Sequence, residues 1–234
     1  MKKTIGILGG MGPMATADLL IKITVNTKAD CDNEHVRVYV DCDCQIPDRT
    51  GAILHGGPDP VPEMATALRH LEACGADCIV MACNTAHHFL PRLQAMTETP
   101  ILDMPAITAM RCAERFPGKT AAILGTTGTL QTGVYDRAMT EAGVPFLLPD
   151  EAQQAFLMHV IYDVVKATKP MQPEQEGWSC LLGDLRARGA DYFILACTEL
   201  PIVAESLSDE GPFVDPTEEL ARAAILFCGY ELKN

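Results

Sequence analysis

Short apolar runs alternate with longer amphipathic stretches along this chain. Runs such as T-I-G-I-L at 4–8 and C-I-V-M-A at 78–82 are apolar throughout, which is typical of parallel strands covered on both faces. The expected strands are 4–8, 36–42, 78–82, 120–124, 146–148 and 192–196. The expected helices are 14–28, 62–73, 85–96, 106–115, 130–142, 152–168, 175–188 and 218–230. The alternation predicts an α/β fold of parallel sheets with right-handed crossovers.

One sequence motif occurs twice in the chain. A-C-N-T at 82–85 and A-C-T at 196–198 each end an apolar run, and each follows an earlier glycine turn. Cys83 lies 74 residues after Gly9 (83 − 9), and Cys197 lies 72 residues after Gly125 (197 − 125). Repetition of strand, glycine turn and strand-Cys-Thr at one spacing indicates a duplicated half-site.

Breaks at 116–118 and 208–212 divide the chain into two lobes. The predicted N-terminal lobe comprises 1–115 plus 212–234, because the last helix is expected to cross back onto it, and the C-terminal lobe comprises 116–211. The glycine- and proline-rich segment 51–62 is expected to be a mobile loop, a candidate lid.

Ligands bind beyond the carboxyl ends of the strands in open parallel sheets, and both repeated cysteines fall there. Two facing half-sites would place two thiols on opposite sides of one cleft, which suits a base on one face of a carbon and an acid on the other. A helix beginning after each cysteine is expected to lower its thiol pKa. Five further cysteines are interpreted as small buried hydrophobes: Cys74, Cys78, Cys112, Cys180 and Cys228.

The formal net charge is −13 and the pI is about 4.8, so nucleic-acid binding is not expected. No run of 18 apolar residues occurs, so no membrane span is expected. The ten cysteines do not form the dense frame of a small disulfide-bonded domain. They are interpreted as reduced thiols, and the expected location is the cytoplasm.

Three other motifs favour less specific roles. The turn G-G-M-G-P at 9–13 lacks the G-x-G-x-x-G spacing of a dinucleotide site, so its N–H groups are expected to receive a carboxylate instead. Zinc binding by Cys31, His35, Cys42 and Cys44 is a weak alternative, because Cys-x-Cys is not the usual ligand spacing. The tandem histidines His87 and His88 are expected on a helix surface or at a helix end.

Six segments together resemble the cofactor-independent aspartate/glutamate racemase family over nearly the whole length. They are I-G-I-L-G-G-M-G-P-M-A-T (5–16), Q-I-P-D-R-T (45–50), C-N-T-A-H (83–87), T-T-G-T (126–129), I-Y-x-x-V-K (161–166) and A-C-T-E (196–199). The resemblance implies two Rossmann-like lobes related by a pseudo-dyad, with the active site in the cleft between them. It also implies a homodimer that needs no cofactor or metal and acts on a small amino acid, aspartate or glutamate.

The resemblance also implies a role for each motif. Cys83 and Cys197 would be the catalytic pair, and Arg49 and Lys166 would hold the two carboxylates of a dicarboxylic amino acid. The remaining substrate-binding residues would be Met11, Asn84, Thr85, Thr127, Gly128, Thr129 and Thr198.

Two carboxylates could bias this site. Asp43 stands near a position where related racemases tend to carry asparagine, and with Asp41 it would disfavour a second substrate carboxylate or bind the ammonium group. Glu199 lies two residues after Cys197, where it would raise the thiol pKa or relay its proton.

Several other functions stay open from the sequence. They are a related cysteine isomerase or decarboxylase of the maleate, hydantoin or malonate type, a broad-specificity racemase of non-acidic amino acids, a binding module without chemistry, and a zinc hydrolase.

Overall fold

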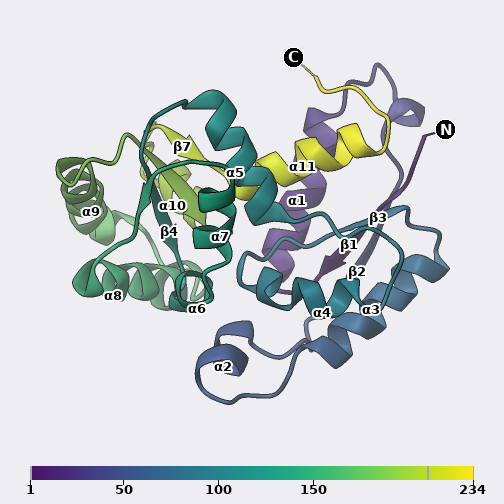
Figure 1. Ribbon diagram of the computed structural model, residues 1–234, viewed down its shortest axis with the longest axis horizontal. Coiled ribbons are helices and arrows are strands. Elements are labelled where there is room, and N and C mark those ends of the chain that lie inside the picture. The colour runs from purple at the N-terminus through teal and green to yellow at the C-terminus, as the bar shows by residue number, and fades with distance from the viewer. Residues whose placement is uncertain (1, 210, 234) are drawn as a thin grey trace. The chain divides into compact units, whose positions relative to one another are not determined.

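The computed structural model describes residues 2–209 and 211–233, and the chain forms two compact units. Unit 1 comprises Met1–Ile107 and Thr217–Asn234, and unit 2 comprises Thr108–Pro216. The chain leaves unit 1 within helix α5 (Met104–Arg115) and returns at the start of α11 (Pro216–Phe227). Each unit is built around its own parallel sheet (Figure 1).

Unit 1 holds the strand order β2-β1-β3, all parallel. From the central strand β1 (Ile5–Gly9) the chain adds β2 (Val38–Cys42) on one side and then β3 (Cys78–Val80) on the other. The direction of winding therefore reverses between β1 and β3, which is where ligands bind in such sheets. The helices are α1 (Pro13–Asn26), α2 (Arg49–Leu54), α3 (Val61–Ala73) and α4 (Leu90–Gln94), with 3₁₀ turns at Asp32–Glu34 and Thr85–Phe89.

Side chains of β3 and its continuation alternate between two cores. Cys78 and Val80 pack on the face that also buries residues of α1 and α11. Ile79 and Met81 pack on the opposite face, against α3 and α4, and Cys83 belongs to that same core. The period of two thus continues from the strand to the cysteine that ends it.

Unit 2 holds the strand order β5-β4-β6-β7, again all parallel. The strands are β4 (Ala121–Gly125), β5 (Phe146–Leu147), β6 (Tyr192–Ala196) and β7 (Phe213–Val214). The helices are α6 (Thr127–Gln131), α7 (Val134–Glu141), α8 (Glu151–His159), α9 (Gln175–Ala187) and α10 (Leu200–Ser206), with a π-helical segment at Val160–Val165 and a 3₁₀ turn at Gln172–Glu174. The winding reverses between β4 and β6.

The alternation recurs in β6. Phe193 and Leu195 pack into the core that contains Trp178, with residues of α8, α9 and α10, and Cys197 continues that row. Tyr192 and Ile194 face the other core. Each repeated cysteine therefore follows a fully buried row of its strand.

The predicted parallel α/β class with two lobes is confirmed, and the predicted strands differ from the observed ones only at their ends. Three predicted helices are wrong as continuous elements. The one at 85–96 breaks before α4, where Pro91 has no N–H to continue the preceding turn. The one at 130–142 breaks at Gly133, whose φ is +66°, and the one at 152–168 becomes π-helical after His159.

Two further expectations are wrong. The start of 51–62 is not a loop, because α2 continues to Leu54 and the carboxylate of Asp48 accepts the N–H of Gly51. Cys74 and Cys180 are exposed rather than buried, since one follows the last turn of α3 and the other lies on the outer side of α9. Cys78, Cys112 and Cys228 are buried as interpreted.

Among residues 2–209 and 211–233, none of the helices combines the length and the apolar character that crossing a bilayer requires.

Gly10→Ala is expected to destabilise unit 1 strongly. Gly10 has φ +88°, and a Cβ there would lie 2.1 Å from the carbonyl oxygen of Asp43. We expect a loss of about 3 kcal/mol or more in the free energy of unfolding, measured by urea denaturation. Gly75→Ala is the matched control, because its φ is +89° but no atom lies within 4 Å of the added Cβ; it should lose only about 1–2 kcal/mol. Equal losses would contradict this packing argument.

Candidate functional site

The first half-site lies where β3 ends in unit 1. Cys83, Asn84 and Thr85 leave the strand buried, with 8%, 3% and 6% exposure. Met11, from the turn after β1, shares a core with Cys83. We call Met11, Arg49, Cys83, Asn84 and Thr85 the unit-1 half-site. All five were predicted from the sequence to surround a substrate.

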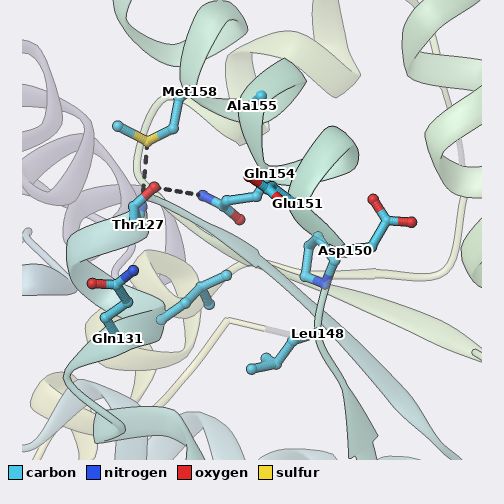
Figure 2. Close-up of a pocket in the computed structure, with 10 residues that line it drawn as sticks. Thr127, Gln131, Leu148, Asp150, Glu151, Gln154, Ala155 and Met158 are labelled. Carbon is cyan, nitrogen blue, oxygen red and sulfur yellow. Dashed lines mark hydrogen bonds between the residues drawn. The ribbon is translucent and has the colours of Figure 1, made fainter.

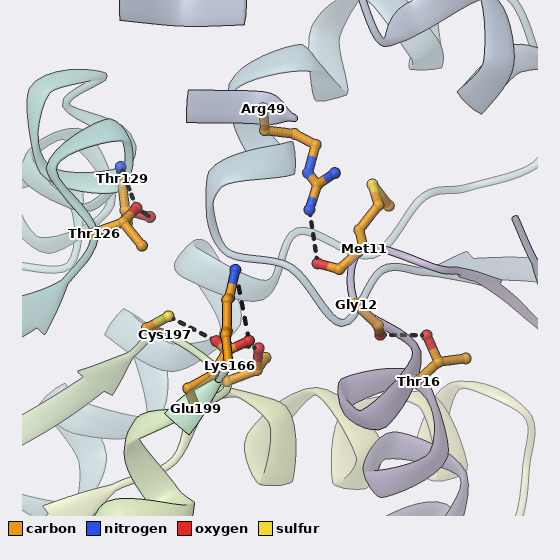
Figure 3. A network of polar contacts seen from close by, with 10 residues as sticks. Met11, Gly12, Thr16, Arg49, Thr126, Thr129, Lys166, Cys197 and Glu199 are labelled. Carbon is orange, nitrogen blue, oxygen red and sulfur yellow. Dashed lines mark hydrogen bonds and ion pairs between the residues drawn. The ribbon is translucent and has the colours of Figure 1, made fainter. Parts of the chain in front are cut away.

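Arg49 is anchored by backbone carbonyls. Its Nη1 donates to the oxygens of Ile46 (3.3 Å) and Pro47 (3.1 Å), and its Nη2 donates to Met11 O at 3.0 Å (Figure 3). Its Nε is buried and has no hydrogen-bond partner among the described residues. The guanidinium therefore ties the β2–α2 loop to the glycine turn and keeps one buried donor.

His87 lies in the 3₁₀ turn at Thr85–Phe89 and supports the backbone of Cys83, which is the expected contact at a helix end, whereas His88 is exposed on the helix surface. The side chain is 2% exposed, and its Nδ1 donates to the carbonyl oxygen of Cys83 at 2.9 Å. Burial lowers the pKa of His87, so the neutral imidazole is the favoured form. The signal available in the sequence was the spacing of four residues from the cysteine, which a short helical turn brings into contact.

Polar groups of the glycine turn after β1 form hydrogen bonds with Thr16, at the start of α1. The Gly10 N–H donates to Thr16 Oγ1 at 2.9 Å, and that hydroxyl donates to Gly12 O at 2.9 Å. The expectation that these N–H groups wait for a carboxylate is wrong for Gly10. Thr16, which the sequence reasoning did not single out, closes the turn.

The second half-site lies where β6 ends in unit 2. The thiol of Cys197 is 7% exposed and donates to Glu199 Oε2 at 2.9 Å. Thr198 Oγ1 donates to the same oxygen at 3.1 Å, and Lys166 Nζ lies 3.7 Å from Glu199 Oε1. Lys166 also lies over the ring of Tyr162, 4.5 Å from its centre. Figure 3 shows the contacts of Glu199 with Cys197 and Lys166.

The environment holds Cys197 in its protonated form. Burial raises its pKa well above the ordinary value, and the carboxylate of Glu199 raises it further, while Lys166 acts in the opposite direction. The expectation that a helix N-terminus lowers the pKa of this thiol is therefore wrong. Desolvation and the adjacent negative charge outweigh the dipole of the seven-residue helix α10.

The turn after β4 contributes three more predicted residues. Thr126 Oγ1 accepts the N–H of Thr129 at 3.1 Å, which begins α6. Gly128 and Thr129 are buried, whereas Thr127 is partly exposed. We call Thr127, Gly128, Thr129, Lys166, Cys197, Thr198 and Glu199 the unit-2 half-site.

The remaining polar predictions lie outside these clusters. Asp43 accepts the N–H of Gln45 at 2.8 Å and so closes its own turn, and Asp41 binds His70 Nδ1 at 2.8 Å. The residues of the weak zinc alternative include three exposed free thiols: Cys31, Cys42 and Cys44. Within the described part of the chain, no three His, Cys, Asp or Glu side chains gather as a metal site would require.

Each of the two parallel α/β units carries a buried cysteine at the reversal point of its sheet. The model of the Asp/Glu/hydantoin racemase family matches residues 8–224. The chain therefore belongs to that family and is an isomerase of the amino-acid racemase type, as the sequence motifs predicted.

Individual relatives agree with this assignment. The chain is 30% identical to a broad-specificity amino-acid racemase of Bacillus subtilis, over 94% of this chain and 96% of the relative. It is 32% identical to the solved aspartate racemase of Picrophilus torridus, with TM-score 0.85 and coverage of 99% and 96%. A glutamate racemase isoform of Bacillus anthracis shares the fold at 19% identity, with TM-score 0.64 and coverage of 97% and 83%.

Glu199→Gln is expected to make Cys197 react faster with iodoacetamide. The substitution removes the negative charge that raises the thiol pKa, so more thiolate is present at a given pH. Site-resolved mass spectrometry between about pH 7 and pH 10 would follow the rate. The exposed thiol of Cys180 is the internal control and should not change. An unchanged rate at Cys197 would mean that Glu199 does not set its protonation.

Proposed function

We propose that this chain is a cofactor-independent amino-acid racemase in which Cys83 and Cys197 are the two acid/base groups. One observation carries the proposal. Each thiol continues a buried row of its strand to the reversal point of its sheet, and each is more than nine-tenths buried. A thiol at that position meets a bound ligand in a water-poor environment.

The reaction needs one thiolate and one thiol. A free thiol has a pKa of about 8.5, far below that of an amino-acid α-hydrogen, so the carbanion must be stabilised where it forms. Because Glu199 and burial hold the proton on Cys197, we assign Cys197 as the acid in the resting enzyme and Cys83 as the base. After turnover the proton has moved, and the roles are exchanged for the opposite enantiomer. Glu199 is positioned to pass the proton from Cys197 to solvent.

Neutral donors supply most of the binding to the carboxylate. Several turn N–H groups are already used, since Gly10 donates to Thr16 and Thr129 to Thr126. We therefore assign substrate binding to the hydroxyls of Thr85 and Thr127 and to the other predicted binding residues: Met11, Asn84, Gly128, Thr129 and Thr198.

Aspartate or glutamate is the substrate class that Arg49 and Lys166 favour, and the aspartate racemase relative supports it. One observation favours a second candidate, a racemase of wider specificity. Lys166 already faces Glu199 at 3.7 Å, so a second substrate carboxylate must compete with that residue for the ammonium group. The broad-specificity relative supports this alternative.

We also propose a cytoplasmic homodimer that binds no nucleic acid or membrane. Support for the dimer comes from the outer face of α1, where Met14, Ile21 and Val25 are 74%, 58% and 57% exposed at helical spacing. The net charge of −13 supports the lack of nucleic-acid binding. Light scattering after size exclusion would give the oligomeric state.

Cys83→Ser and Cys197→Ser are each expected to abolish racemisation, with losses of about 10²–10⁴-fold in kcat. Single enantiomers would be incubated in heavy water without added cofactor, and both deuterium at Cα and the opposite enantiomer would be measured. Each variant keeps one thiol, so each should exchange the α-hydrogen of one enantiomer with retention, and the two variants should prefer opposite enantiomers.

The exposed thiols supply the control, because Cys74→Ser and Cys180→Ser should keep wild-type kcat. Wild-type racemisation by either active-site variant would overturn the two-thiol mechanism. Deuterium uptake without inversion by the unmodified enzyme would favour a related isomerase or decarboxylase.

Lys166→Met is expected to separate acidic from neutral substrates. If the ammonium group binds a side-chain carboxylate, KM for aspartate should rise about tenfold while KM for asparagine changes little. If the ammonium group binds only Glu199, the KM values for aspartate and asparagine should change by the same factor. That result would make the dicarboxylate assignment wrong. Thermal unfolding would control for stability.

A further inference from the structure

Gln154, a residue outside both half-sites, donates a hydrogen bond to Thr127, a predicted substrate-binding residue. Gln154 Nε2 donates to Gly125 O at 3.0 Å. It also donates to Thr127 Oγ1 at 3.2 Å, as Figure 2 shows. Met158 lies one turn further along α8, and its sulfur accepts the N–H of Thr127 at 3.3 Å. Two residues four positions apart on one helix thus hold both the hydroxyl and the backbone of Thr127.

The orientation of the carboxamide follows from chemistry. Gly125 O is a carbonyl and can only accept, so the nitrogen of Gln154 must face it. The same nitrogen donates to Thr127 Oγ1, which leaves the hydroxyl hydrogen of Thr127 free to point elsewhere. An amide at this position therefore makes Thr127 a donor toward a ligand.

The side chain of Gln154 also carries a cost in stability. The other end of the carboxamide, Gln154 Oε1, is buried and has no hydrogen-bond partner among the described residues. A buried acceptor without a partner is costly and uncommon. The group lies against a cavity of about 710 Å³ that is lined by α6, α8 and the loop after β5, and Thr127, Gln154 and Met158 are among its lining residues.

We propose that Gln154 is a positioning residue for racemisation, which orients the Thr127 hydroxyl so that it donates to the substrate carboxylate. The inference rests on the proposed function, because it needs Thr127 to contact substrate. Met158 fixes the backbone of the same residue, so α8 sets both the place and the polarity of this donor.

Gln154→Glu tests the polarity directly. A carboxylate of the same shape accepts only, so it would take the Thr127 hydroxyl hydrogen and face Gly125 O with repulsion. KM should rise about tenfold, the expected cost of one hydrogen bond to a charged group, while kcat changes less than about threefold. Gln131→Glu is the matched control. It makes the same chemical change in the same cavity, and the side chain of Gln131 has no hydrogen bond to Thr127 among the described residues.

A double-mutant cycle separates this role from a structural one. In a Thr127→Val background no hydroxyl remains to orient, so Gln154→Glu should add little further increase in KM. Racemisation by the unmodified enzyme and its loss in Cys83→Ser would first establish the proposed function independently. Full additivity in the cycle, or an equal KM for Gln154→Glu and the unmodified enzyme, would overturn the role of Gln154 and leave the two-thiol mechanism standing. A loss of thermal stability without a change in KM would equally overturn it.

Discussion

Burial of the central strands on both faces is the constraint on which the two half-sites depend. A strand covered on both sides sends alternate side chains into two cores, so the first residues beyond its end inherit a fixed direction. Cys83 follows the row of Ile79 and Met81, and Cys197 follows the row of Phe193 and Leu195. The thiols are therefore held by the packing of their units, although each lies just beyond the end of its strand.

The same burial disfavours ionisation of the Cys197 thiol, and Glu199 adds to that effect. A desolvated thiol resists ionisation, and an adjacent carboxylate strengthens that resistance at Cys197. Lys166 offsets part of the effect, since its ammonium lies 3.7 Å from the carboxylate. The result is a thiol that favours its protonated form, which is the state that the proposed role as general acid requires.

The strands and the two cysteine positions could be predicted because they depend on local composition and on a repeated spacing. The helices at 85–96 and 130–142 could not, because Pro91 and Gly133 interrupt patterns whose periodicity continues through them. Residues that contact partners distant in the sequence could not be recognised from the sequence around them either. Gln154 lies 27 positions from Thr127, and only the docking of α8 beside the turn after β4 joins them. Thr16 and His87 were closer in sequence to the residues they support, so their spacing could have revealed them.

The two units share a sequence pattern, but different chemical groups surround their two cysteines. Both units end a buried row with a cysteine, but the supporting groups differ: a neutral imidazole holds the backbone beside Cys83, whereas an ionised network holds the side chain of Cys197. A racemase must nevertheless run in both directions, so the free energies of its two protonation states cannot differ much at working pH. The carboxylate of Glu199 raises the pKa of Cys197 and the ammonium of Lys166 lowers it, so under the proposed mechanism the balance of these two charges sets how readily the thiol gives up its proton.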